Sequence, residues 1–168
     1  MKKSKKYPYA RVTFWQKFHF GSKFDHIEVK HKSDWIMNIN SLTIKAQQAL
    51  QSAAITAQQS SQQAVEPLHL LSVLVAEDNS LGSFLLGRAG VNIESLRAAV
   101  AQELSRLPKV SGAGEPYFAG DTTKVIQRAV DYTKMFNDRY ASVEHLLLAL
   151  MAERGVASDS LKSHGAAE

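Results

Sequence analysis

The sequence predicts an all-α fold built as a tandem duplicated four-helix unit with pseudo-twofold symmetry. One short apolar phrase occurs twice, as EPLHLLSVLV at 66–75 and as SVEHLLLALM at 142–151. When His69 is aligned with His145, three leucines of the first phrase coincide with three of the second. A helix with so wide an apolar face must be buried on several sides. We therefore expect each phrase to form the central helix of one copy.

Two further observations support the duplication. The segment LGRAGVN at 86–92 has a counterpart in LKSHGAA at 161–167, at nearly the same offset. From Met37 onward, apolar residues recur three to four positions apart, which is the spacing of an amphipathic helix. Both segments contain a glycine that suits the end of a helix, because glycine accepts the left-handed conformation without strain.

The first copy is predicted over 37–107. Thr43 can cap a helix over TIKAQQALQSAAITAQ, in which Ile44, Gln47, Leu50, Ala54 and Ala57 share one face. Pro67 suits the first turn of the second helix, because its missing amide would have no intrahelical partner there. A third helix is expected near 81–88, ended by Gly90. Asn92 can cap the fourth.

The second copy is predicted over 121–168, after a linker at 108–120 that is rich in proline and glycine. Asp121 and Thr122 can cap its first helix, and Ser142 can cap the helix that contains the repeated phrase. The third helix is expected at about 159–163. The sequence ends where the fourth would begin, so the last helix of this copy is expected to be missing. We expect that truncation to expose Leu146, Leu150 and Leu161, and to make the second copy less stable than the first.

Residues 1–36 differ from the rest of the chain. They carry nine Lys or Arg against three Asp or Glu, and they hold eight of the fourteen aromatic residues. The remainder carries eleven basic against thirteen acidic residues. We interpret this basic aromatic extension as unstructured or, preferably, as a misassigned start, with translation beginning at Met37.

The mixture of bases and aromatics at 1–36 could also suit nucleic acid or an anionic membrane surface. It does not form the apolar core of a secretory signal, because Lys17 follows soon after Phe14 and Trp15. No stretch has the roughly 18 consecutive apolar residues of a membrane-spanning helix. We therefore expect a cytoplasmic protein without a membrane partner, and we do not favour a nucleic-acid partner.

The sequence holds no motif that supports catalysis. It contains no cysteine, which excludes thiol nucleophiles, disulfides and zinc thiolate sites. The glycine-rich GAGEPYFAG lacks the lysine and hydroxyl residue of a phosphate-binding loop. The Glu-x-x-His spacing of EPLH occurs in di-iron bundles, but the second phrase has Ser142 where such a site needs a glutamate. We therefore interpret His69 and His145 as structural residues, and we predict a chain with no enzymatic activity, catalytic residue, metal site or cofactor.

The doubled HLLxxL helix, with AG or HG at the end of the next helix, resembles the Clp repeat domain. This domain lies at the N-terminus of Clp-family AAA+ unfoldases. The connector LPKVSG followed by EPY, and the opening MNINSLTIKAQQALQSA, are similar to the ClpB disaggregase branch. The resemblance covers about 37–168. It implies a substrate-recognition domain that binds unfolded or aggregated polypeptides in a shallow apolar groove.

The resemblance also implies which residues bind substrate. The groove residues of the family correspond here to Thr43, Asp138 and Glu144, with Tyr132 as an apolar wall. Arg128 stands where the family often has an apolar residue. In a full-length protein the resemblance implies a hexameric AAA+ ring, a DnaK-type partner chaperone, and ATP with Mg²⁺ in ATPase domains that this sequence lacks.

Two other functions remain open. One is the N-domain of a protease-coupled Clp unfoldase, which would bind adaptors, although LPKVSG argues against it. The other is a stand-alone Clp-repeat adaptor or regulator, for which residues 1–36 are a candidate tether to nucleic acid. A salt-dependent affinity for DNA that is lost on deletion of 1–36 would support the stand-alone protein.

Overall fold

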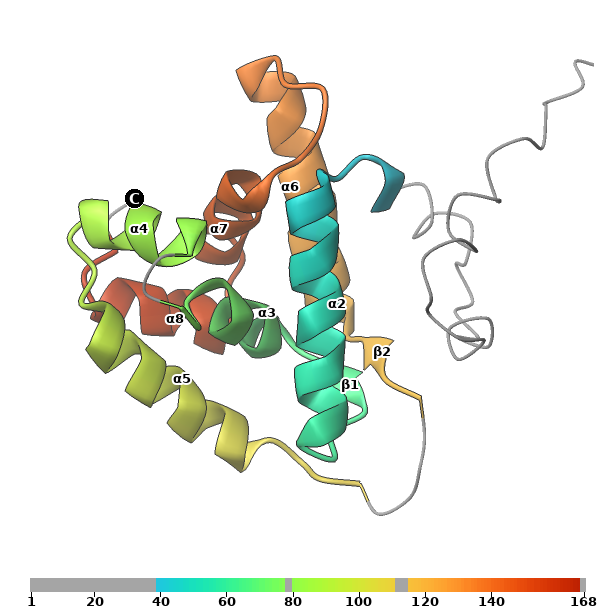
Figure 1. Ribbon diagram of the computed structural model, residues 1–168, viewed down its shortest axis with the longest axis vertical. Coiled ribbons are helices and arrows are strands. Elements are labelled where there is room, and N and C mark those ends of the chain that lie inside the picture. The colour runs from blue at the N-terminus through green and yellow to red at the C-terminus, as the bar shows by residue number, and fades with distance from the viewer. Residues whose placement is uncertain (1–38, 78–79, 111–114, 167–168) are drawn as a thin grey trace, which may run out of the picture.

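The chain folds into a cluster of helices joined at one edge by a two-stranded sheet (Figure 1). The structure, a computed structural model, describes residues 39–77, 80–110 and 115–166. The predicted all-α class is confirmed, since helices make up most of the described residues. The duplication stays a prediction, as do the boundaries drawn from it, and the predicted extension at 1–36 lies outside the described residues.

The first half of the fold contains four helices close to their predicted positions: α2 (Ile44–Gln59), α3 (Pro67–Leu74), α4 (Leu81–Arg88) and α5 (Ile93–Arg106). Thr43 and Asn92 cap α2 and α5 as predicted, each accepting a hydrogen bond from a backbone amide of the first turn. Pro67 is the first residue of α3. Gly90 has φ +89°, the left-handed conformation expected after α4.

The second half contains α6 (Gly120–Phe136), α7 (Val143–Ala152) and α8 (Val156–Ser163). Ser142 caps α7 as predicted. The predicted caps of α6 were wrong, because the helix begins earlier, after Ala119, and both Asp121 and Thr122 lie inside its first turn. The predicted start of α8 was also too late.

The predicted linker at 108–120 contains a strand that the sequence did not indicate. Strand β2 (Tyr117–Phe118) pairs in parallel with β1 (Ala64–Val65), which follows α2. The buried Thr122 hydroxyl donates a hydrogen bond of 2.6 Å to the carbonyl of Val65, next to this pair. The sheet therefore ties the start of α6 to the segment between α2 and α3.

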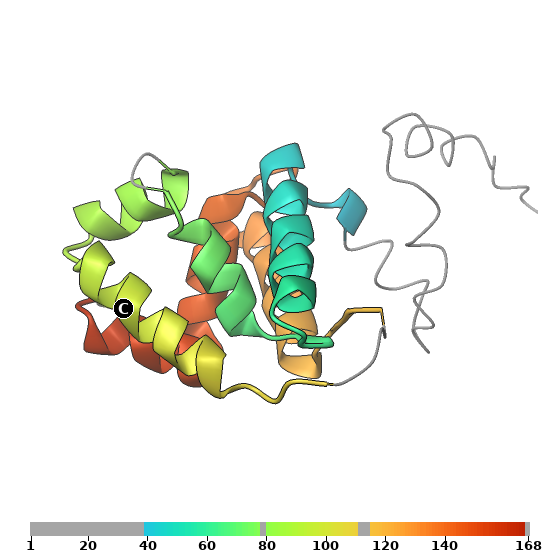
Figure 2. The same cartoon turned by 60° about the horizontal axis from the view of Figure 1, so that its bottom comes forward.

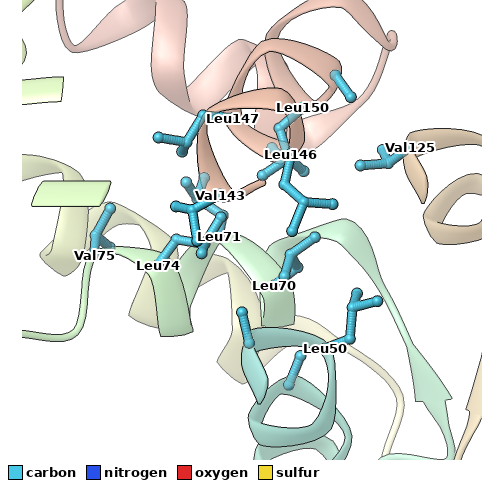
Figure 3. Packing of buried hydrophobic residues seen from close by; sticks show 14 of the residues in the cluster. Leu50, Leu70, Leu71, Leu74, Val75, Val125, Val143, Leu146, Leu147 and Leu150 are labelled. Carbon is cyan, nitrogen blue, oxygen red and sulfur yellow. The ribbon is translucent and has the colours of Figure 1, made fainter. Parts of the chain in front are cut away.

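A single hydrophobic core runs through both halves. Figure 3 shows leucines of α3 (Leu70, Leu71 and Leu74) facing leucines of α7 (Leu146, Leu147 and Leu150). Helix α2 packs on α3 and α7, while α6 packs on α7 and α3. In Figures 1 and 2, α4, α5 and α8 lie on the opposite side of this central pair from α2 and α6.

The expected exposure of the second half was wrong. Leu146, Leu150 and Leu161 are 0 %, 1 % and 0 % exposed. The reason is that α8 packs on α3, α5 and α7, so helices of the first half cover the leucines. None of the described helices is long and apolar enough to cross a membrane.

Candidate functional site: a groove at the start of α7

Backbone hydrogen bonds bring the start of α2 to the start of α7. Leu42 and Ala141 form an isolated parallel bridge. The amide of Thr43 donates to the carbonyl of Ala141 at 2.8 Å, and the amide of Ala141 donates to the carbonyl of Ser41 at 2.7 Å. Segments about one hundred residues apart are thereby held side by side, which no local pattern in the sequence indicates.

The end of α6 turns the chain toward this bridge. Asn137 has φ +57°, a left-handed conformation that asparagine adopts more readily than most residues. The amide of Asp138 then donates to the carbonyl of Thr133 at 2.8 Å, which closes the helix end. Phe136 is consequently the last residue of α6, and 54 % of its surface is exposed.

An open groove of about 570 Å³ lies between the start of α2, the end of α6 and the start of α7. Three partly exposed apolar side chains, Phe136, Tyr140 and Leu148, supply its apolar surface. The guanidinium of Arg139 lies 5.3 Å from the centroid of the Tyr140 ring, a cation–π contact that covers one face of that ring. The groove is lined by Thr43, Phe136, Asp138, Arg139, Tyr140, Ser142, Glu144, His145 and Leu148.

Two carboxylates and three hydroxyls give the groove acceptor groups. Partial burial alone would raise the pKa of Glu144, but hydrogen bonds from Ser142 and its own backbone amide, with the positive charge of Lys45, lower that pKa overall. Glu144 also lies in the first turn of α7, where the helix dipole favours an anion. Glu144 is therefore ionised at neutral pH.

Asp138 and His145 lie next to each other in the groove lining. The Nε2 atom of His145 lies 3.3 Å from Oδ2 of Asp138. The His145 side chain is 6 % exposed, whereas the Asp138 side chain is 53 % exposed. Among the described residues, no group of three or more potential metal ligands is present.

The structure brings together three of the four residues that the sequence singled out. Thr43, Asp138 and Glu144 all line the groove. Thr43 also caps α2 through its hydroxyl, so the same side chain both caps a helix and lines the groove. Tyr132 does not line the groove: it lies one turn before Phe136, with the two ring centroids 6.2 Å apart. Its role as an apolar wall stays a prediction.

Arg128, which occupies a position that is often apolar in the resembling family, is also outside the lining. Its guanidinium forms an ion pair with Glu153 at the end of α7 and also interacts with Tyr132. Arg128 and Glu153 therefore join α6 to α7.

The sequence did not single out the apolar lining residues Phe136, Tyr140 and Leu148. By its spacing, Phe136 lies on the same helical face as the buried Val125 and Ala129, and periodicity alone cannot show that the helix ends at Phe136. The neighbouring Asn137, followed by Asp138, was an available signal, because asparagine favours helix ends and turns. Nothing in the spacing of residues indicates that α2 begins beside this turn.

A family model for the Clp repeat (R) N-terminal domain matches residues 41–164. The chain belongs to the Clp N-terminal domain family. It is 44 % identical over 132 residues to "Chaperone protein ClpB" of Porphyromonas gingivalis, an alignment that covers 79 % of this chain and 15 % of that protein. The predicted resemblance is thus confirmed.

Solved Clp N-domains have the same fold. The Hsp104 N-terminal domain from Candida albicans matches with a TM-score of 0.67 at 21 % identity, covering 76 % of this chain and 83 % of that chain. A complex of the ClpV N-domain with a VipB peptide matches with a TM-score of 0.63 at 18 % identity, covering 77 % and 82 %. The chain spans about 15 % of the length of the ClpB relative that it matches.

Proposed function

We propose that this Clp N-terminal domain is the substrate-recognition domain of a ClpB-type disaggregase, and that its groove binds unfolded or aggregated polypeptides. The observation that carries the proposal is the position of three exposed apolar side chains beside two carboxylates at one helix start. Unfolded chains expose apolar side chains and backbone amides together. The groove offers partners for both.

The shape and chemistry of the groove suit polypeptides of many different sequences. It is open, and its apolar surface is modest, so it imposes little shape selection. Carboxylates accept hydrogen bonds from backbone amides, which every residue except proline carries. Such a surface favours weak binding, because ordering a flexible chain costs entropy and few contacts offset it. Weak binding suits a domain that passes its substrate onward.

Two relatives support a polypeptide as the ligand. The 44 % identical relative is named a ClpB chaperone, which favours the disaggregase branch over a protease-coupled unfoldase. A domain with the same fold, that of ClpV, has been solved with a VipB peptide. We infer that this fold can present a peptide-binding surface in more than one Clp protein.

The remaining parts of the proposal concern the whole protein. Because the chain spans about 15 % of its ClpB relative, ATP-driven threading through a hexameric ring would depend on regions outside it. A DnaK-type partner, ATP with Mg²⁺ and a cytoplasmic location belong to the same proposal. The domain alone is proposed to bind without turnover.

The groove can be tested by fluorescence anisotropy with labelled, reduced and carboxymethylated α-lactalbumin, a permanently unfolded probe. Asp138→Ala and Tyr140→Ala are each expected to weaken binding by about threefold to tenfold, the effect of one lost polar or apolar contact. Asp131→Ala is the matched control, because the Asp131 side chain is also 53 % exposed but lies outside the groove lining. Equal losses in all three variants, or none, would argue against the groove.

A further inference from the structure

His69 and His145 begin α3 and α7 in the same way. The Nδ1 atom of each ring accepts a hydrogen bond from the backbone amide of the residue that caps its helix, Glu66 at 3.0 Å and Ser142 at 3.1 Å. An imidazole nitrogen that accepts a hydrogen bond carries no proton, so in the neutral ring the proton is on Nε2. Each histidine therefore directs an Nε2–H group away from its own helix start.

The two Nε2–H groups have different partners. That of His69 lies 2.7 Å from Oε1 of Gln62, inside the core. That of His145 is buried, makes no hydrogen bond with any residue that the structure describes, and lies 3.3 Å from Oδ2 of Asp138. A buried donor without an aligned acceptor is unfavourable, so a better-aligned Asp138 carboxylate would stabilise this region.

The imidazole of His145 is held in place on its other side. The ring of Phe136 contacts it edge-on, with centroids 5.6 Å apart and an interplanar angle of 68°. The capping hydrogen bond fixes one ring nitrogen, and Phe136 restrains the ring plane. The direction of the Nε2–H group is therefore set by the fold, whereas the half-exposed Asp138 side chain is less confined by its surroundings.

We propose that His145 is a positioning residue of the groove: its Nε2–H orients the Asp138 carboxylate to accept a backbone N–H group of an extended polypeptide. The inference rests on the proposed function. One oxygen of Asp138 faces the imidazole, and the other is directed to the ligand. Binding of a backbone amide aligns the carboxylate and thereby supplies the acceptor that the buried donor lacks.

The test uses the 168-residue chain and the same α-lactalbumin probe. His145→Leu is expected to weaken binding by about fivefold to tenfold, the effect of misplacing one hydrogen-bond acceptor. His145→Gln is expected to restore affinity to within about twofold. Glutamine can accept the Ser142 amide, as in the usual capping box, and can still donate toward Asp138.

The matched control is His69→Leu, which removes the same capping contact and buried donor in the other half of the fold. It is expected to lower the thermal midpoint as His145→Leu does, while leaving probe affinity unchanged. If His145→Leu does not fold, His145→Glu replaces it, because glutamate keeps the capping acceptor and lacks the donor.

A double-mutant cycle separates positioning from a general structural effect. If His145 acts through Asp138, His145→Leu causes no further loss of affinity in an Asp138→Asn background. A full additional loss in that background, or no rescue by glutamine, would overturn the proposal while leaving the groove intact. A wild-type chain that fails to bind the probe would overturn the groove and the positioning role together.

Discussion

At the scale of single residues, a buried amide and a buried imidazole join distant helices of the first half. Gln62 donates through Nε2 to the carbonyl of Leu104 at 2.8 Å, and its Oε1 pairs with Nε2 of His69. Both side chains are almost fully buried. The neutral ring satisfies both of its nitrogens, so the native fold requires His69 without a charge.

This requirement predicts how stability depends on pH. Burial lowers the pKa of His69, and the hydrogen bond that its Nδ1 accepts from the Glu66 amide is available only to the neutral ring. A lowered pKa in the folded state means that the unfolded chain binds the proton first. The contribution to stability is therefore complete above about pH 6.5 and is lost as pH falls below that value, by at most about 1.4 kcal/mol per pH unit.

Urea unfolding at pH 7.5, 6.5 and 5.5 measures this loss. His69→Gln keeps a capping acceptor and is expected to flatten the profile relative to wild type. Glu66 changes the stability with pH in the opposite direction, because desolvation and the charge of Asp121 raise its pKa. The quantity to compare is therefore the difference in unfolding free energy between wild type and His69→Gln at each pH. Parallel profiles would show that His69 is not the titrating group.

At the scale of secondary-structure elements, tertiary contacts decide where two helices begin. The amide of Ala119 donates a hydrogen bond of 3.1 Å to the carbonyl of Val65, directly after β2. Helix α6 therefore begins after Ala119, before Asp121 and Thr122, which were the predicted caps. Helix α8 begins directly after Gly155, whose φ of +148° lies in the region that glycine alone adopts easily. The caps of α2 and α5, by contrast, are local and were predictable.

The crossing of α3 and α4 predicts a sensitive position at Gly82. A Cβ atom there would lie 2.2 Å from the carbonyl oxygen of Leu74, which is backbone and cannot rotate away. Gly82→Ala is therefore expected to lower the free energy of unfolding by about 1–3 kcal/mol, the usual effect of overpacking. Gly87→Ala is the control in the same helix, because its Cβ would meet nothing closer than 4.0 Å.

The control is expected to raise stability by about 0.5–1 kcal/mol, since alanine favours a helix over glycine. Thermal and urea unfolding of the two variants give opposite signs if the contact with Leu74 is real. A stabilising effect at both positions would mean that α3 and α4 can separate without loss.

At the scale of the whole molecule, the two halves share one core rather than packing as independent units. Leu161 of α8 is fully buried, and α8 packs on α3 and α5 of the first half. The loop after α4 is also joined to the end of α8, because the amide of Asn92 donates to the carbonyl of His164 at 3.2 Å. We expect the described region to unfold in one cooperative transition.

Native-state hydrogen exchange measures this cooperativity. The slowest amides of α3 and of α7 are expected to exchange with similar free energies of opening, both close to that of global unfolding. The wild-type chain at several low urea concentrations is sufficient for the comparison. Protection of α7 that is lower by several kcal/mol would show that the second half opens by itself, contrary to the shared core.

The sequence by itself determined the helices, most of their ends and the family, because these follow from local spacing, capping residues and the repeated phrase. It also placed Thr43, Asp138 and Glu144 together, but only through the family resemblance. The tertiary structure alone decided that Leu146, Leu150 and Leu161 are covered, and that Phe136 and Tyr140 line the groove. These outcomes depend on which distant segments meet, such as Ser41 with Ala141. Because the hydrophobic effect is non-directional, an apolar pattern shows that a side chain tends to be buried but not which distant segment covers it.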